Sequence, residues 1–340
     1  MPGPHPATAA IRYAVRSALA DLSPGAVVLA AVSGGADSLA LAAAVAFEAP
    51  KLRLWAGAVI VDHALVADAA GIARRAADQC RELGLDPVEV VRVQVEQAGG
   101  GLESAARDAR YTALEDSARR LGAAVVLLGH TLDDQAEQVL LGLARGSGTR
   151  SLAGMRARRG ILRRPLLSVT REQTRASCQA QGMAWWDDPM NDDPAYLRVR
   201  ARRALGDLER DLGPGIAAAL ARSAEHLRED ADHLDALADQ FLADSMYSST
   251  GIRCRNTSNQ RDVVTVEAMM GLPRAIRTRV WRRLLIAAGA PPGQVSARHT
   301  DECDRLLTDW HGQGPLHVPG DLRVARDGAE VTIGPVAADR

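Results

Sequence analysis

The stretch that decides the fold is residues 26–38, which read Ala-Val-Val-Leu-Ala-Ala-Val-Ser-Gly-Gly-Ala-Asp-Ser. The first seven residues form a short apolar run, which predicts a strand buried on both faces, as in a parallel sheet. The polar segment Ser33–Ser38 follows, and the apolar residues over 37–48 predict a helix behind it. Backbone N–H groups of such a loop, at a helix N-terminus, form an anion site. The alternative is a plain turn with a Ser or Asp helix cap.

The same unit of strand and helix recurs along the first half of the chain. Further strands are predicted at 54–61, 87–95 and 123–128, and the helices behind them at 67–83, 102–121 and 133–144. This alternation predicts a doubly wound, mostly parallel, Rossmann-like α/β sheet. In such sheets ligands bind outside the carboxyl ends of the strands. Ser33, Asp62, His63 and His130 follow three of the predicted strands, so we expect them to converge on one crevice.

A second, smaller domain is predicted after the alternation stops. Gly213-Pro214-Gly215 marks the boundary, which gives domains of 1–212 and 213–340. Helical patterns over 215–244 and 273–289 predict a mainly helical domain, and short apolar alternations in 315–334 add a small β appendage.

Composition narrows the setting and the class of partner. The formal net charge is −1, and Lys51 is the only lysine among 41 basic residues. Residues 145–176 hold nine arginines and one acid, a local excess suited to phosphate or nucleic acid. The four cysteines are scattered, which argues against zinc, iron–sulfur and disulfide frameworks and favours a cytoplasmic protein. No apolar stretch approaches the length of a membrane span, so no membrane partner is expected.

Two groups of carboxylates carry the predicted chemistry. Asp37 would stand beside bound phosphates, an arrangement that calls for Mg²⁺ between the charges. Asp133 reads as a helix cap, whereas Asp134 and Glu137 share one face of the next helix. Two stacked carboxylates need a cation between them, either a metal or a substrate ammonium. The alternative, for each acid taken alone, is that it has no binding role: it would be a solvated residue in the first turn of the helix, where the helix dipole favours a negative charge.

Several segments, in this order, resemble the PP-loop (N-type ATP pyrophosphatase) superfamily, and within it the tRNA(Ile)-lysidine synthetases. The matching segments are S-G-G-A-D-S, V-D-H-A-L, E-S-A-A-R-D-A-R-Y, H-T-L-D-D-Q-A-E-Q-V-L-L, R-G-S-G, L-A-G-M, R-P-L-L and W-W-D-D-P-M-N-D-D-P-A-Y-L-R. They span residues 27 to about 203. The first is specific only to the superfamily, and the D-D-Q-A-E and D-D-P-x-N blocks are specific to the lysidine enzymes.

The resemblance implies a two-step ligase reaction. ATP adenylates the wobble cytidine of a tRNA(Ile) with a CAU anticodon and releases pyrophosphate, and the ε-amine of free L-lysine then displaces AMP to give lysidine. ATP and Mg²⁺ are the implied cofactors, a homodimer is compatible with the sequence, and the second domain would handle tRNA.

The resemblance also implies roles for particular residues. ATP would be bound by Ser33, Gly34, Gly35, Ala36, Asp37, Ser38, Asp62, His63 and His130. Catalytic roles fall to Asp37, which would also hold Mg²⁺, and to Arg107, Arg110, Arg198 and Arg202. Lysine would be held by Asp134 and Glu137. The tRNA would be contacted by Arg145, Arg163, Arg164, Arg200 and Arg203, and the arginine-rich second half would follow the tRNA backbone.

Departures and alternatives remain at this point. The family usually places Asn after Tyr-x-Arg, but here Val199 follows Arg198, so the choice between Arg198 and Arg202 is open. Beyond residue 215 the likeness is loose.

Other functions of the fold remain as alternatives. A tRNA-thiolating PP-loop enzyme would need a catalytic cysteine pair or cluster-binding cysteines, which the sequence lacks. An amide-forming PP-loop synthetase acting on a small molecule would leave the arginine-rich segment unexplained, and a non-enzymatic nucleotide sensor would leave the acids unexplained.

Overall fold

The computed structural model describes residues 3–62, 68–93, 102–146, 148–246, 252–253 and 262–336. The chain divides into two compact units. The first comprises residues 1–147 and 151–225, and the second comprises 148–150 and 226–340. Helix α9 (Ile216–Met246) contributes its first residues to one unit and the remainder to the other. The domain boundary at residue 212 stays a prediction. None of the described helices is both long and apolar enough to cross a membrane.

The first unit is built on a six-stranded sheet of order β3-β2-β1-β4-β6-β5. The strands are β1 (Val27–Val32), β2 (Trp55–Asp62), β3 (Val88–Arg92), β4 (Ala123–Leu127), β5 (Arg158–Arg159) and β6 (Leu162–Arg163). All neighbours pair in parallel except β5 with β6. The predicted α/β class and the four predicted strands are confirmed. Strands β5 and β6 were not predicted, because two-residue strands carry no periodic signal.

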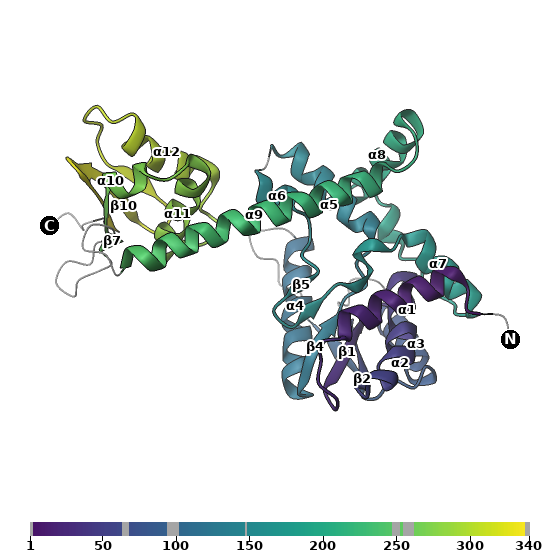
Figure 1. The fold of residues 1–340 in the computed structure, drawn as a ribbon. Coiled ribbons are helices and arrows are strands. Elements are labelled where there is room, and N and C mark those ends of the chain that lie inside the picture. Colours follow the sequence, from purple (N-terminus) through teal and green to yellow (C-terminus); the bar gives the residue numbers. More distant parts are fainter. Residues whose placement is uncertain are drawn as a thin grey trace. The chain divides into compact units, whose positions relative to one another are not determined.

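Helices cover both faces of this sheet, as Figure 1 shows. The principal helices of the unit are α1 (Pro6–Leu19), α2 (Ala36–Glu48), α3 (Ala69–Glu82), α4 (Leu102–Arg120), α5 (Leu132–Ala144), α7 (Arg171–Ala180) and α8 (Leu197–Leu212). Short turns of helix are α6 (Thr149–Leu152), η1 (Pro50–Leu52), η2 (Pro165–Ser168) and η3 (Pro189–Asp192). Helices α1, α2, α3 and α7 share one apolar cluster, and α4 lies on the other face.

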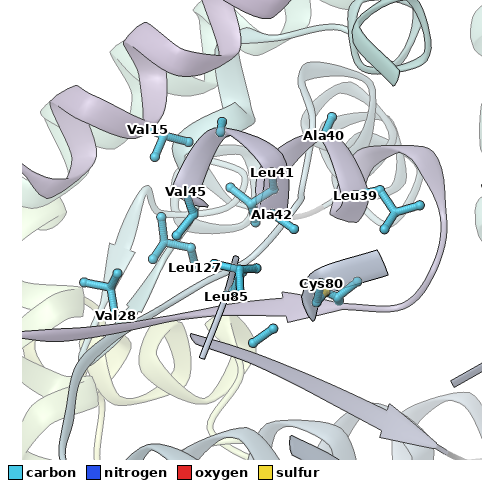
Figure 2. Close-up of a cluster of buried hydrophobic side chains, with 14 of the residues drawn as sticks. Val15, Val28, Leu39, Ala40, Leu41, Ala42, Val45, Cys80, Leu85 and Leu127 are labelled. Carbon is cyan, nitrogen blue, oxygen red and sulfur yellow. The ribbon is translucent and has the colours of Figure 1, made fainter. Parts of the chain in front are cut away.

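Alternation along β1 explains why both faces are apolar. Val28 points into the cluster of α1, α2 and α7, where Leu41 and Cys80 also lie (Figure 2). Leu29, the next residue, points into the cluster of Leu114 on α4. Successive side chains of a strand face opposite sides, so a strand covered on both faces must be apolar throughout.

The second unit carries a five-stranded antiparallel sheet of order β7-β8-β11-β10-β9. Its strands are β7 (Ile252–Arg253), β8 (Asp262–Thr265), β9 (Leu316–Val318), β10 (Leu322–Asp327) and β11 (Glu330–Pro335), and its helices besides α9 are α10 (Val266–Met270), α11 (Arg274–Ala287) and α12 (Ala297–Thr308). Its core surrounds the fully buried Trp281.

The arginines of α11 are engaged within the second unit. Arg277 makes a bidentate contact with the buried Asp304, and Arg283 pairs with Asp239. The remaining three have partners as well, in that Arg274 binds Asp301, Arg279 binds Asp235, and Arg282 donates to the carbonyls of Pro292 and Val295. These contacts stabilise the fold of the second unit, and the expectation that the arginine-rich second half follows the tRNA backbone stays a prediction.

Arg163 and Arg164 are also structural. Arg163 is 8% exposed and donates two hydrogen bonds to the carboxylate of Asp21, at 2.6 and 3.0 Å, which ties β6 to the residue just past α1. Arg164 is 4% exposed and donates to the carbonyl of Arg156 and the hydroxyl of Tyr111. Neither guanidinium is at the surface, so the prediction that they contact tRNA is wrong.

The Asp21–Arg163 pair predicts a pH-dependent stability. The hydrogen bond from Arg163 lowers the pKa of Asp21 to about 2, below its usual value near 3.8. A lowered pKa stabilises the folded state above pH ~4, and this contribution is lost as the pH falls toward 2. We expect Asp21→Asn to lower the free energy of unfolding at pH 7 by about 1 kcal/mol, because Arg163 is buried but the Asp21 side chain is 44% exposed and screened by solvent. Urea unfolding should show this difference shrinking below pH ~4.

The control for this prediction is Asp116→Asn. Asp116 pairs with Arg119 on α4, with 46% and 77% of the two side chains exposed. Exposed pairs contribute about 0–1 kcal/mol, so this variant should unfold almost like the parent protein. A difference at pH 7 no larger for Asp21→Asn than for Asp116→Asn would contradict the structural role of Asp21.

Candidate active site

A cleft of about 740 Å³ opens at the carboxyl ends of β1, β2 and β4. Ser33, Asp62 and His130 all line it, as their positions after predicted strands indicated. His63 lies outside the described residues. In the sheet, β2 and β3 lie on one side of β1, whereas β4 lies on the other side. The order of the strands therefore reverses at β1. Ligands of doubly wound sheets bind at such a point.

The Ser33–Ser38 loop forms the floor of the cleft. Gly34 has a φ of +85°, which favours glycine, and its carbonyl accepts a hydrogen bond from the N–H of Trp186. The Ser38 hydroxyl donates to the carbonyl of Gly35 and accepts from the N–H of Ser33, which holds the turn closed. Gly35 is the N-cap of α2, and within the described residues no side chain caps it. The first N–H groups of α2 are therefore available to an anion.

Gly129 lets the end of β4 approach this loop. A Cβ at Gly129 would lie 3.1 Å from the backbone carbonyl atoms of Asp37 and 3.2 Å from Cα of Ser38. Any larger residue would displace the start of α2. The cleft geometry therefore depends on the absence of a side chain at this position.

Asp37 faces the cleft from the first turn of α2. One carboxylate oxygen accepts a hydrogen bond from Thr174, and the other lies 3.7 Å from Nε of Arg171. Burial raises the pKa of Asp37, and Thr174 and Arg171 only partly oppose that effect. Mg²⁺ is commonly held by one or two carboxylates together with substrate phosphates. A single carboxylate beside an anion-binding loop fits that pattern.

Thr131 caps α5, which corrects the prediction for Asp133. The Thr131 hydroxyl accepts the N–H of Asp134, and the Asp134 carboxylate accepts the N–H of Thr131 at 2.8 Å. Threonine and aspartate are both good caps, so the sequence alone did not separate them. Asp133 instead accepts the backbone N–H of Arg171 at 2.8 Å.

The cation between the stacked carboxylates is Arg171, a residue that the sequence did not single out. Its guanidinium lies 3.0 Å from Asp134 and 3.4 Å from Glu137, and Nε of Arg202 lies 2.7 Å from the same Glu137 oxygen. Asp134, Arg171 and Arg202 line the cleft, whereas Glu137 is only 2% exposed. The structure thus shows an arginine of the protein itself beside both carboxylates, and the binding of a further cation there stays a prediction.

Opposing effects set the charges of this cluster. Burial acts to raise the pKa of Asp134, but Arg171 and the hydrogen bond from Thr131 outweigh it, so the pKa is lowered. Burial acts to lower the pKa of Arg171, and Asp134, Glu137 and Asp37 outweigh it, so that pKa is raised. Both groups are therefore charged at neutral pH.

His130 presents a neutral ring to the cleft. Burial lowers its pKa to about 3, Asp134 opposes the shift, and the nearby Arg110 and Arg164 reinforce it. Its Nδ1 has no hydrogen-bond partner in the part of the chain that is described. A neutral imidazole can donate one hydrogen bond and accept another, which suits it to a nucleotide.

The predicted catalytic arginines separate in space. Arg110 lines the main cleft, whereas Arg107 lines a smaller hollow of about 190 Å³ with Tyr111 and Arg159. Of Arg198 and Arg202, Arg202 lines the main cleft. Burial, together with Arg107 and Arg198, lowers the pKa of Arg110. The remaining predicted tRNA contacts, Arg145, Arg200 and Arg203, are exposed.

The described cysteines do not take part in the cleft. Cys178 lies beneath the loop and donates to the carbonyl of Ala36, and burial raises its pKa to about 12. No cysteine is among the described residues that line the cleft. The described lining of the cleft therefore offers no thiol for sulfur transfer.

Comparison with known proteins places the chain in a family. Residues 8–209 match the PP-loop domain, and residues 265–329 match the TilS substrate binding domain. The tRNA(Ile)-lysidine synthase of Streptomyces coelicolor is 48% identical over 361 residues, which cover 97% of this chain and 99% of the relative. The chain belongs to the tRNA(Ile)-lysidine synthase family. The Thermobifida fusca enzyme of this family is 51% identical, with 98% and 99% covered.

A solved structure also matches the lysidine synthase fold seen here. The U34-tRNA thiolase NcsA from Methanococcus maripaludis, with its [4Fe-4S] cluster, aligns with a TM-score of 0.55 and 19% sequence identity. The match covers 66% of this chain and 80% of that chain. At this identity the likeness concerns the fold alone.

Gly129→Ala tests the close approach that shapes the nucleotide site. Overpacking typically costs about 1–3 kcal/mol, and if it displaces the loop, ATP affinity falls about tenfold to hundredfold. Isothermal titration calorimetry with a non-hydrolysable ATP analogue measures the change. The matched control is Gly206→Ala on α8, where a Cβ would meet nothing within 4 Å. Equal affinities for the two variants would refute the proposed constraint.

Proposed function

We propose that this protein is a tRNA(Ile)-lysidine synthase, which uses ATP to join free L-lysine to the wobble cytidine of a CAU-anticodon tRNA(Ile). The observation that carries the proposal is one cleft with an anion-binding loop on its floor and a carboxylate cluster on its wall. A ligase that couples ATP cleavage to capture of an amine needs these two opposite polarities within reach of one another. Membership of the family and the near-complete coverage by relatives support the same conclusion.

We assign the phosphates of ATP to the Ser33–Ser38 loop. The N–H groups at the start of α2 would hold the pyrophosphate, and the helix dipole would favour its charge. Asp37 would hold Mg²⁺ against the phosphates, and this ion would neutralise charge on the leaving group. The neutral His130 and the buried Asp62 would contact the adenosine. Arg110 and Arg202, which line the cleft, would meet the phosphate of the activated intermediate.

We assign the substrate lysine to the wall that carries Asp134. Its carboxylate faces the cleft and is ionised at neutral pH because Arg171 lowers its pKa. Glu137 lies behind Arg171 and Arg202 and would act on lysine through its charge and its hold on these arginines. The substrate tRNA would meet the exposed Arg145, Arg200 and Arg203, whose contacts with phosphates weaken as salt rises. The reaction would take place in the cytoplasm.

The test of the function is product analysis. Purified protein, ATP, Mg²⁺, lysine and a CAU-anticodon tRNA(Ile) should give AMP, pyrophosphate and a modified tRNA. Mass spectrometry of the digested tRNA should find cytidine heavier by one lysine less one water. An unmodified or thiolated cytidine would exclude the proposal, and omission of lysine should abolish product formation.

Asp134→Asn should raise the KM for lysine tenfold or more and leave the KM for ATP within about threefold. A hydrogen bond to a charged group contributes about 1.5–3 kcal/mol, and 1.4 kcal/mol corresponds to about tenfold. Steady-state AMP release at varied lysine and varied ATP separates the two constants. The control is Asp187→Asn, a cleft-lining acid whose side chain is 71% exposed. Equal increases in both KM values would show that Asp134 serves the nucleotide instead.

A further inference from the structure

Three arginines gather around one tyrosine of α4, Tyr111. The Tyr111 hydroxyl accepts hydrogen bonds from Arg107 at 3.4 Å and from Arg164 at 3.3 Å. The guanidinium carbon of Arg107 lies 5.1 Å from the centre of the Tyr111 ring, and that of Arg110 lies 5.6 Å from it. Both distances are within the range of a cation–π interaction. Tyr111 therefore touches all three guanidiniums.

The three arginines form no ion pair with an acid among the described side chains. Asp108 and Glu115 line the smaller hollow together with Arg107, but both acids are exposed and neither pairs with it. Arg164 is buried, and its Nε has no hydrogen-bond partner in the described part of the chain. Like charges repel one another. The contacts of Tyr111, a neutral acceptor with an electron-rich ring, therefore oppose this repulsion.

The hydroxyl and the ring of Tyr111 contact different partners. Arg164 follows β6 and also donates to the carbonyl of Arg156 at 2.9 Å, so its bond to the hydroxyl ties the tyrosine to the sheet. Arg107 and Tyr111 are four residues apart on α4 and therefore share a face of the helix. Arg110 meets only the ring. The hydroxyl thus fixes the ring, and the ring restrains Arg110.

Electrostatic effects agree with these contacts. Burial acts to raise the pKa of Tyr111, but the hydrogen bond from Arg164 and the charges of the three arginines outweigh it, so the pKa is lowered. Burial, Arg107 and Arg198 lower the pKa of Arg110, whereas Tyr111 acts to raise it. Tyr111 therefore favours the charged form of Arg110.

We propose that Tyr111 is a positioning residue, which holds Arg110 at the main cleft while it holds Arg107 at the smaller hollow. Arg110 lines the cleft, whereas Arg107 and Tyr111 line the hollow. The inference rests on the proposed function, because there Arg110 would meet the phosphate of the activated intermediate. A guanidinium that is fixed beforehand costs no reorganisation when charge develops on that phosphate. Loss of the tyrosine should therefore slow the reaction without weakening the binding of ATP or lysine.

The test is a double-mutant cycle on kcat, measured as AMP release at saturating ATP, lysine and tRNA. Tyr111→Leu should lower kcat about tenfold or more, while the KM values for ATP and lysine stay within about threefold of the parent values. In an Arg110→Gln background the same substitution should change kcat by less than about threefold, because the residue through which it acts is gone. A structural defect would instead lower kcat by the same factor in both backgrounds. That result, or an unchanged kcat in Tyr111→Leu, would overturn the proposal.

The matched control is Tyr13→Leu. Tyr13 lies on α1, is 69% exposed, and is not among the residues that line the cleft or the smaller hollow. This variant should keep the kcat of the parent protein.

Ionisation of Tyr111 supplies a second measurement if Tyr111→Leu does not fold. The near-ultraviolet absorbance change that Tyr111→Phe removes from the pH titration reports this hydroxyl. It should occur at a lower pH than for free tyrosine, and Arg107→Gln should move it to a higher pH, because one positive charge is lost. Ionisation like that of free tyrosine would contradict the contacts and overturn the proposal. Absence of lysidine in the parent protein would instead reject the proposed function, since the titration needs no product.

Discussion

Parallel pairing of β1 with both β2 and β4 is the constraint on which the rest of the site depends. Because the three strands run in the same direction, their carboxyl ends meet at one edge of the sheet. The first turn of α2 can then lie against Gly129, with no side chain between the two backbones. The phosphate loop, His130 and the start of α5 are brought together by this contact, although they are far apart in sequence.

The cleft can hold both an anion-binding loop and a cluster of carboxylates because the two lie on different helices. The loop at the start of α2 offers backbone N–H groups, and α5 offers carboxylates in its first two turns. Helix α7 separates the two by inserting Arg171 between them. Its capping box of Thr170 and Gln173 fixes where that helix begins, and so fixes the position of the guanidinium.

The sequence predicted the α/β class, the first four strands and the convergence of Ser33, Asp62 and His130, because apolar runs and strand-end polar residues are local signals. It did not predict Arg171, whose contacts join residues 34 and 37 positions apart. The Thr170–Gln173 capping box could have located the start of α7, but not the partner of Arg171. Composition also did not reveal that Arg163 and Arg277 bind acids of their own unit, because the excess of arginine says nothing about the partner of each side chain.

The buried thiols have a consequence for the response of the fold to oxidants. Cys80, Cys178 and Cys303 are free and buried, and burial raises the pKa of each to about 12. Peroxides and disulfides react with thiolates, which are scarce at neutral pH when the pKa is so high. Oxidation of these three residues therefore requires local opening of the core. Cys178, directly beneath the nucleotide loop, therefore stays a thiol under mild oxidation while the protein stays folded.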